Sequence, residues 1–339
     1  MAQAAIRDID FLAARLHGRR SVLAEGGRLD DLCRLHTVGE LCRAVGVDLG
    51  PQPSADAFQR HVLADYAHDL KTLAESVPTE YASFFEWQRY RFHVENVKVV
   101  LRGLWAKKSA DEINARMIGE SLPPGFRVAD ELPDDPAEIA GLVDVAPCLA
   151  DTVAALSEVY VLLPSLFTLE TALDTGYFAE LMRRASQCKG DEGGVGALAR
   201  QETATFLTML ALRGAGNYRL QPAVIGAFYV EGAPLSRATF ARIASAPIPD
   251  AIEAASDIAF DKLPPDAQIH DVEAACWSRY LRLANRLFRR GHMNVAAVAG
   301  FLGIRRVEVA NLITMSEGLR LGMDSRELRA RLIPRESQA

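Results

Sequence analysis

One glycine-centred pattern occurs three times in the chain, and it limits the possible folds more than any other feature. Gly103, Gly214 and Gly318 each follow an apolar stretch, and an apolar residue stands ten and fourteen positions after each of them. The residues ten positions on are Ile113, Val224 and Leu328, and those fourteen positions on are Met117, Phe228 and Leu332. Such a repeat predicts three related units of about a hundred residues.

The apolar spacing around the first glycine is typical of an α-helix. Its apolar residues step by three or four positions, which places them on one stripe of a helix. They are Trp87, Tyr90, Val94, Val97, Leu101 and Leu104. We expect this helix to end near Gly103 and Ser109 to cap the next one. Asn96 and Asn311 precede their glycines by seven positions, but Leu207 holds that place in the middle copy, which has therefore diverged.

Composition and patterning indicate helices throughout the chain. The sequence is 49% hydrophobic and 24% charged, which is ordinary for a globular protein. No long strand pattern stands out, so we predict an all-α fold. The first boundary is expected in a linker rich in proline and acidic residues at 119–136. The predicted units are residues 1–120, 121–232 and 233–335, followed by a tail at 336–339.

The cysteines and the lengths of the apolar runs indicate which cellular compartment suits the chain. The five cysteines include no CxxC pair, which argues against a disulfide framework and a zinc site, and a reducing cytosol suits them. The N-terminus lacks the apolar core of a signal peptide. Because no run of eighteen apolar residues occurs, we expect no membrane span.

Charge is unevenly distributed along the chain. The net charge is −6, but residues 279–335 hold twelve arginines, no lysine and four acidic residues, which gives +8 there and −14 elsewhere. Five of these arginines form a stripe opposite the face that carries Tyr280, Leu283 and Leu287. They are Arg279, Arg282, Arg286, Arg289 and Arg290. The stripe is either a solvated face or a docking surface for an acidic protein or a membrane-proximal ring.

These five arginines are our predicted partner-binding residues. Nucleic acid suits them less well, because the overall charge is negative and no recognition motif accompanies them.

No motif for catalysis or cofactor binding stands out. Gly190–Gly196 precedes a predicted helix, but it follows no strand and no Gly-Lys-Ser/Thr follows it, so we interpret it as an interhelical loop rather than a phosphate cradle. His61, Asp65 and His68 share one helical face, but without an HExxH pattern a polar surface is the preferred interpretation. We expect no catalytic residue, cofactor or metal.

Several polar residues stand beside apolar helical positions. They are His93, Glu95 and Asn96 in the first copy, and Glu308 and Asn311 in the third. We interpret them as hydrogen-bonding groups that fix helix packing between the units of the repeat.

Segments of two repeat copies resemble those of one known family. Val94–Lys98 with Leu101–Gly103, Glu308–Leu312 with Gly318, the closing Arg326–Leu332 and the opening Ile9–Arg19 carry the resemblance. The family is the C subunit of V-type and A-type rotary ATPases, which is homologous to the d subunit of eukaryotic V-ATPases. The resemblance covers essentially the whole chain.

This resemblance implies an all-helical funnel of three pseudo-symmetric units around a central cavity. It also implies a non-catalytic rotor subunit that seats the D and F central-stalk subunits on the membrane ring of proteolipid subunits. Such a subunit transmits torque between ATP chemistry and ion transport, such as proton transport. It binds no cofactor and lies peripherally on the cytoplasmic face of the membrane.

Two other functions are open on the sequence alone. One is a free-standing helical-repeat adaptor that binds an acidic protein partner. The other is a metal-dependent hydrolase that would use His61, Asp65 and His68 as ligands.

Overall fold

The computed structural model describes residues 9–119, 145–188, 194–291 and 294–334. These residues form sixteen α-helices and no β-strand, which confirms the predicted all-α class. Apart from Gly119, the predicted linker at 119–136 lies outside the described residues, as does the predicted tail at 336–339.

The helices divide between two compact units, each assembled from segments that are distant in sequence. Unit 1 is Met1–Glu86, Cys188–Leu198 and Ala274–Ala339, and unit 2 is Trp87–Gln187 and Ala199–Glu273. The division falls inside three long helices, α5 (Thr79–Trp105), α11 (Gly194–Gly216) and α15 (Ile269–Arg290). The division into three units and the funnel with its cavity stay predictions.

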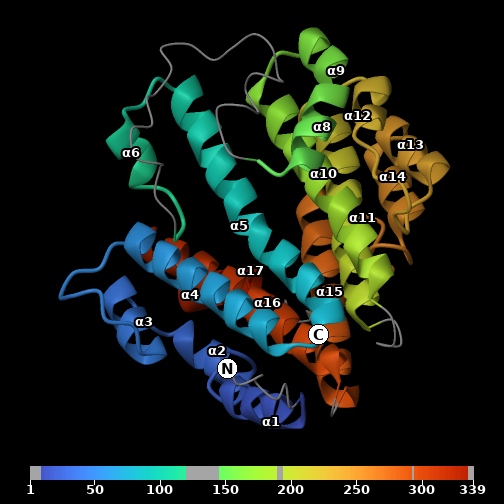
Figure 1. The fold of residues 1–339 in the computed structure, drawn as a ribbon. Coiled ribbons are helices and arrows are strands. Elements are labelled where there is room, and N and C mark those ends of the chain that lie inside the picture. The colour runs from blue at the N-terminus through green and yellow to red at the C-terminus, as the bar shows by residue number, and fades with distance from the viewer. Residues whose placement is uncertain (1–8, 120–144, 189–193, 292–293, 335–339) are drawn as a thin grey trace. The chain divides into compact units, whose positions relative to one another are not determined.

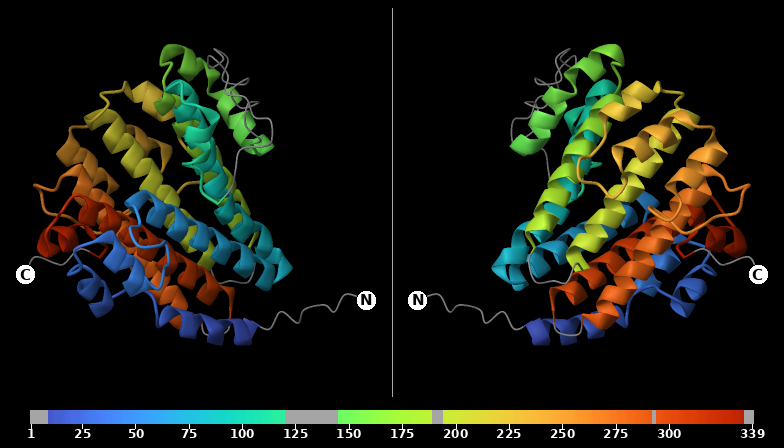
Figure 2. Two further views of the ribbon diagram at one scale, coloured as in Figure 1. Left: turned by 90° about the vertical axis from the view of Figure 1, so that its left-hand side faces the viewer. Right: turned by 90° about the vertical axis from the view of Figure 1, so that its right-hand side faces the viewer.

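Unit 1 is organised around α16 (Val295–Arg320), a helix that is buried along most of its length. The long helix α4 (Ala55–Ser76) lies along it, as Figures 1 and 2 show. Tyr66 on α4 donates a hydrogen bond to the carbonyl of Leu302 on α16 at 3.2 Å. The remaining short helices of unit 1 are α1 (Ile9–Arg20), α2 (Gly27–Leu32), α3 (Val38–Val45) and α17 (Ser325–Arg331).

Small residues on α16 allow α15 to approach it closely. A Cβ added at Gly300 would lie 2.5 Å from the backbone nitrogen of Phe288, and one at Gly303 would lie 2.8 Å from the Cβ of Ala284. Larger side chains at these positions would push the two helices apart.

Unit 2 is built on α10 (Leu166–Gln187) together with most of α5 and α11. Trp87 on α5 donates its indole N–H to the carbonyl of Tyr177 on α10 at 3.0 Å, and their rings stack with centroids 5.7 Å apart. Burial of these aromatic rings holds the two helices together. The shorter helices are α6 (Ala110–Asn114), α8 (Pro147–Ala155), α9 (Ser157–Leu162), α12 (Pro222–Ala227), α13 (Arg237–Ser245) and α14 (Ile248–Ala255).

Each repeat glycine lies where a long helix contacts the short helix that follows it. A Cβ added at Gly103 would lie 2.3 Å from Cγ1 of Ile113, and one at Gly318 would lie 2.6 Å from Cδ1 of Leu328. Both contact residues stand ten positions after their glycine, as the sequence predicts. The glycines therefore make room for the apolar anchor of the next helix.

In the middle copy the residue that contacts the glycine stands eleven positions on, one later than Val224. Gly214 faces Ile225 instead, where an added Cβ would lie 3.0 Å from Cδ1. The cause is a longer turn: the backbone N–H that bonds to the glycine carbonyl belongs to Leu220, six residues on, at 2.9 Å. In the other two copies that N–H comes from five residues on, at 2.8 and 2.9 Å.

All three turns contain a residue in the left-handed region of backbone space. These are Lys107 with φ of 53°, Arg219 with φ of 52° and Gly322 with φ of 71°. A left-handed residue allows the N–H that follows it to turn back to the helix carbonyls, which closes the helix end.

The two repeat asparagines pair with the backbone in the same way. The side-chain amide of Asn96 donates to the carbonyl of Ile118 at 3.0 Å and accepts from the N–H of Ile118 at 2.8 Å. Asn311 makes the equivalent pair with Ile333 at 2.7 and 2.9 Å. Each partner lies 22 residues further along the chain. Both asparagines fix packing through hydrogen bonds, as predicted, but the bonds form within one repeat copy and not between copies.

Replacing Asn311 with alanine should destabilise the protein by about 2 kcal/mol, because two hydrogen bonds are lost and the backbone groups of Ile333 lose their partner. Urea unfolding followed by circular dichroism would measure the loss. Thr314→Ala on the same helix is the control, since it removes only a local bond to the Ala310 carbonyl. Equal unfolding midpoints for the two variants would show that the amide pair contributes nothing.

Candidate functional site

The five predicted partner-binding arginines all lie on α15, within unit 1. Four of them are exposed and share one side of the helix, and we call them the arginine surface: Arg282, Arg286, Arg289 and Arg290. Arg279 is half-buried one turn earlier and does not line the same hollow. The structure thus brings four of the five predicted residues together.

The opposite side of α15 is buried, as the predicted amphipathic pattern requires. Tyr280, Ala284 and Phe288 recur every four residues and are buried. Leu283 and Leu287, which we predicted for the same apolar face, are half-buried.

The arginine surface borders an open hollow of about 460 Å³, which its four side chains line together with Asn285. The amide oxygen of Asn285 accepts a hydrogen bond from Arg20 at 2.5 Å, and Arg20 also pairs with Glu25 at 2.7 Å. No acidic side chain is among the described residues that line the hollow. Its lining therefore favours an anionic partner, because guanidinium groups bind carboxylates and phosphates bidentately.

A buried ionic cluster lies elsewhere in unit 1. Arg305 on α16 contacts Asp65 and Asp69 of α4 at 2.5 and 3.3 Å, and Glu308 on its own helix at 2.5 Å. Burial opposes the charged state, but the three carboxylates raise the pKa of Arg305 above its usual value. Arg305 therefore stays charged and joins two long helices.

The same cluster also holds the chain segment around α1. Arg19 on α1 forms an ion pair with Asp69, and Glu308 accepts a hydrogen bond from the backbone N–H of Ala24 at 2.6 Å. Asp69 and Glu308 are both buried. These contacts connect α1 and the segment after it to α4 and α16, which agrees with the predicted packing role of Glu308.

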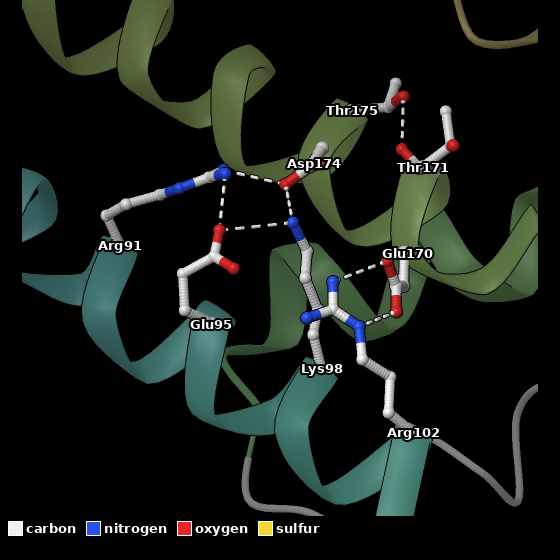
Figure 3. A network of polar contacts seen from close by, with 8 residues as sticks. All are labelled: Arg91, Glu95, Lys98, Arg102, Glu170, Thr171, Asp174 and Thr175. Carbon is white, nitrogen blue, oxygen red and sulfur yellow. Dashed lines mark hydrogen bonds and ion pairs between the residues drawn. The ribbon is translucent and has the colours of Figure 1, made fainter. Parts of the chain in front are cut away.

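A second ionic cluster lies in unit 2, between α5 and α10, as Figure 3 shows. Lys98 is buried and contacts Glu95 at 3.2 Å and Asp174 at 2.5 Å. Arg91 contacts the same two carboxylates at 2.5 and 2.7 Å. Two cations and two anions therefore share these contacts, and their charges balance. Glu95 has the predicted packing role.

One turn further along, Arg102 binds Glu170 through two hydrogen bonds of 2.6 and 2.8 Å (Figure 3). Arg102 is about half exposed, so solvent weakens this pair. Behind it on α10, Thr175 donates its hydroxyl to the carbonyl of Thr171 at 2.7 Å. The buried Lys98 and the exposed Arg102 extend the contact between the two helices over two turns.

These clusters were not predicted as sets, although the sequence contains a partial signal. Lys98 and Arg102 are four residues apart, and so are Glu170 and Asp174. Opposite charges with matched helical spacing can meet across two helices. The sequence does not say which two helices are neighbours, so the pairing emerges only from the fold.

The histidine and aspartate set on α4 is not arranged as a metal site. His61, Asp65 and His68 do not converge, and Asp65 is paired with Arg305. Across the residues that the structure describes, no three His, Cys, Asp or Glu side chains gather in a way that could hold a metal. The hydrolase alternative has no support in this geometry.

The glycine-rich stretch is only partly described. Residues 189–193 lie outside the described part, so the predicted loop at Gly190–Gly196 stays a prediction there. Gly194 and Gly196 fall in the first turn of α11, and a Cβ at Gly194 would lie 2.8 Å from the Cβ of Ala296. Close packing against α16 accounts for Gly194 without a bound phosphate.

None of the described helices is long and apolar enough to cross a membrane.

Comparison with known proteins gives two consistent matches. The sequence profile of a family described as "ATP synthase (C/AC39) subunit" matches residues 12–331. A curated relative, the C subunit of the A-type ATP synthase of Haloferax volcanii, is 24% identical over 96% of this chain and 97% of its own length. The family match takes in the three repeat glycines and both ionic clusters.

The cluster of Figure 3 should make the protein more stable above pH 5 than in acid. Burial opposes ionisation of Glu95, but Arg91 and Lys98 outweigh it and hold the pKa of Glu95 at about 2, below its usual 4.5. A carboxyl whose pKa is lowered by folding contributes stability above its unfolded pKa and loses it as the pH falls toward the folded pKa. The loss therefore falls between about pH 4.5 and 2.

Replacing Glu95 with glutamine should remove this contribution. The shift corresponds to at most about 3 kcal/mol, and solvent reduces it because the side chain is 31% exposed. Urea unfolding at pH 7 and at pH 2.5 should show a smaller difference in unfolding free energy than in the wild type. Glu86→Gln, at an exposed position of α5, is the control, and identical pH profiles for both variants would contradict the assignment.

Proposed function

The chain belongs to the ATP synthase (C/AC39) subunit family, and on that premise we propose that it is a non-catalytic rotor subunit that couples a central stalk to a membrane ring. The observation that carries the proposal is the family match over residues 12–331, which spans segments of both compact units. The relative from Haloferax volcanii is named as the C subunit of an A-type ATP synthase, and we extend that assignment to this chain.

A rotor link has to pass torque without rearranging. The two ionic clusters suit this task, because each ties long helices together through several charged contacts with defined geometry. Arg305 joins α16 to α4, and Lys98 joins α5 to α10. Sliding of the helices would leave a buried charge unpaired, which is costly, so the contacts oppose sliding. In this proposal the chain takes no chemical part in ATP turnover.

We place the D and F stalk subunits on the arginine surface. Its guanidinium groups supply a positive field without an acidic residue in the lining of the hollow. Arg279 lies one turn earlier on the same helix, outside the hollow, and we include it in the proposed site as a further positive charge. An acidic surface on the stalk would be attracted to it over about 8 Å in physiological salt. The proteolipid ring would then bind a different surface, and the protein would lie peripherally on the cytoplasmic face of the membrane.

The proposal is tested by mixing the purified chain with the D and F subunits of the same organism. Size-exclusion chromatography with light scattering should detect a complex with one copy of each. A folded helical chain that ignores the stalk would contradict the proposal. If that chain instead captures a soluble acidic protein, the adaptor function would replace it.

The arginine surface has its own test. Arg282→Glu with Arg286→Glu should weaken stalk binding at least tenfold in 0.1 M salt, because two favourable charges become repulsive. Wild-type affinity should also fall as salt rises from 0.05 to 0.5 M, through screening. The control is Arg242→Glu with Arg326→Glu, which changes the net charge equally at positions outside the surface. Equal losses in both double variants would show that only net charge matters.

A further inference from the structure

Three guanidinium groups of the arginine surface have no anionic partner in the described part of the chain. Arg286, Arg289 and Arg290 form neither an ion pair nor a side-chain hydrogen bond with any residue that the structure describes. By contrast, every cation in Figure 3 is paired with a carboxylate. The hollow of the arginine surface therefore holds positive charge that the described residues leave uncompensated.

The positions of the arginines on α15 reduce the stability of the helix. Residues four apart on a helix are neighbours, and like charges there repel each other. Arg286 stands in two such pairs, with Arg282 and with Arg290. The helix dipole favours cations in the last turn, which contains Arg289 and Arg290. Helix stability therefore does not account for the charge at Arg282 and Arg286, and a bound anion would relieve the repulsion.

The hollow has the size and the lining of a site for a small polar anion. Its volume of about 460 Å³ lies within the range of small-molecule sites. The side-chain amide of Asn285 is already engaged, because its oxygen accepts from Arg20 and its nitrogen donates to the carbonyl of Leu281 at 3.0 Å. The guanidinium groups are therefore the main donors that the described lining offers to a ligand.

The hollow is lined by arginine and not by lysine, and this points to phosphate. A guanidinium group is a planar fork that binds two oxygens of a phosphate at once. A phosphate group in turn offers three strong acceptor oxygens. From Arg282 to Arg290 the helix rises about 12 Å. A ligand with several linked phosphates can therefore contact more of this row than a single phosphate or carboxylate can.

The surroundings of the hollow favour a soluble ligand over a phospholipid headgroup. None of the described residues that line the hollow is apolar. Among the described residues, none of the large apolar side chains that are exposed lies on α15. Apolar side chains that enter the lipid strengthen attachment to a membrane surface. The described part of α15 offers no exposed side chain of this kind beside its arginines.

We propose that the arginine surface is also a binding site for a soluble oligophosphate, a molecule that carries two or more linked phosphate groups. Because this ligand would occupy the surface on which we place the stalk, the two exclude each other. The binding site stands on the geometry of α15, whereas the competition rests on the proposed function. A rise in the oligophosphate concentration would reduce the fraction of chains that can accept the stalk.

The binding site is tested by titration calorimetry with inorganic triphosphate, without divalent cations. The variant R286Q/R289Q removes two charges from the hollow, and the control R242Q/R326Q removes two at exposed positions outside it. Both variants should keep the helical content of the wild type. We expect one triphosphate per chain, bound at least about tenfold more weakly by R286Q/R289Q and with wild-type affinity by the control. No binding by the wild type, or equal losses in both variants, would overturn the site.

Two further ligands test the chemical class. Citrate carries its negative charge on carboxylates, and it should bind at least about tenfold more weakly than triphosphate. Vesicles of phosphatidylcholine with phosphatidic acid present phosphate at a membrane surface, and they should also bind more weakly. Equal binding of citrate would overturn the assignment to phosphate. Vesicle binding that is as tight as that of triphosphate and depends on Arg286 and Arg289 would assign the surface to lipid and overturn the soluble ligand.

Competition at constant ionic strength separates the inference from the proposed function. The affinity of the wild type for the D and F subunits should fall about twofold when the triphosphate concentration equals its dissociation constant. Stalk binding that triphosphate leaves unchanged would overturn the competition. Stalk binding by a chain that does not bind triphosphate would overturn the inference and leave the proposed function standing. Triphosphate binding without stalk binding would contradict the proposed function and leave the site standing.

Discussion

The packing of unit 1 depends on the ion pairs that the guanidinium group of Arg305 forms. This group is buried, and its partners are carboxylates of α4 and of its own helix, one of which also holds the backbone at Ala24. A buried charge is tolerated only when other groups replace the water that it has lost. The helices α1, α4 and α16 therefore share one arrangement in which every member of the cluster is satisfied. Apolar faces alone would permit several registers.

Unit 2 also contains a buried cation that must be paired with carboxylates, and here it is a lysine. Lys98 is buried, and Arg91 completes the charge balance with Glu95 and Asp174. In both units the charged contacts connect helices that are far apart in sequence, while apolar contacts supply most of the burial. For a subunit proposed to carry torque, this division has a mechanical meaning: the apolar faces provide cohesion, and the charged clusters oppose sliding along the helix axes.

Much of the local structure could be predicted from the sequence, and the long-range pairing could not. The spacing from Gly103 to Ile113 and from Gly318 to Leu328 predicts the helix ends correctly, because that contact is local. The same count fails at Gly214, since one extra residue in the turn is invisible to spacing alone. The arginine surface follows from helical periodicity. The partners of Arg305 do not, because Asp65 and Asp69 precede it by more than two hundred residues and many acidic residues could have paired with it.

The amide pairs of Asn96 and Asn311 have a consequence for the order of folding. Each closes a loop of only 22 residues that contains a helix end, its turn and the following short helix. Short loops cost little chain entropy to close, and local contacts form ahead of distant ones. The contact of Tyr66 with Leu302 spans 236 residues. We therefore expect the two segments closed by Asn96 and Asn311 to fold early. The middle copy has Leu207 in place of the asparagine, and we expect it to fold later, by packing against the copies that have already folded.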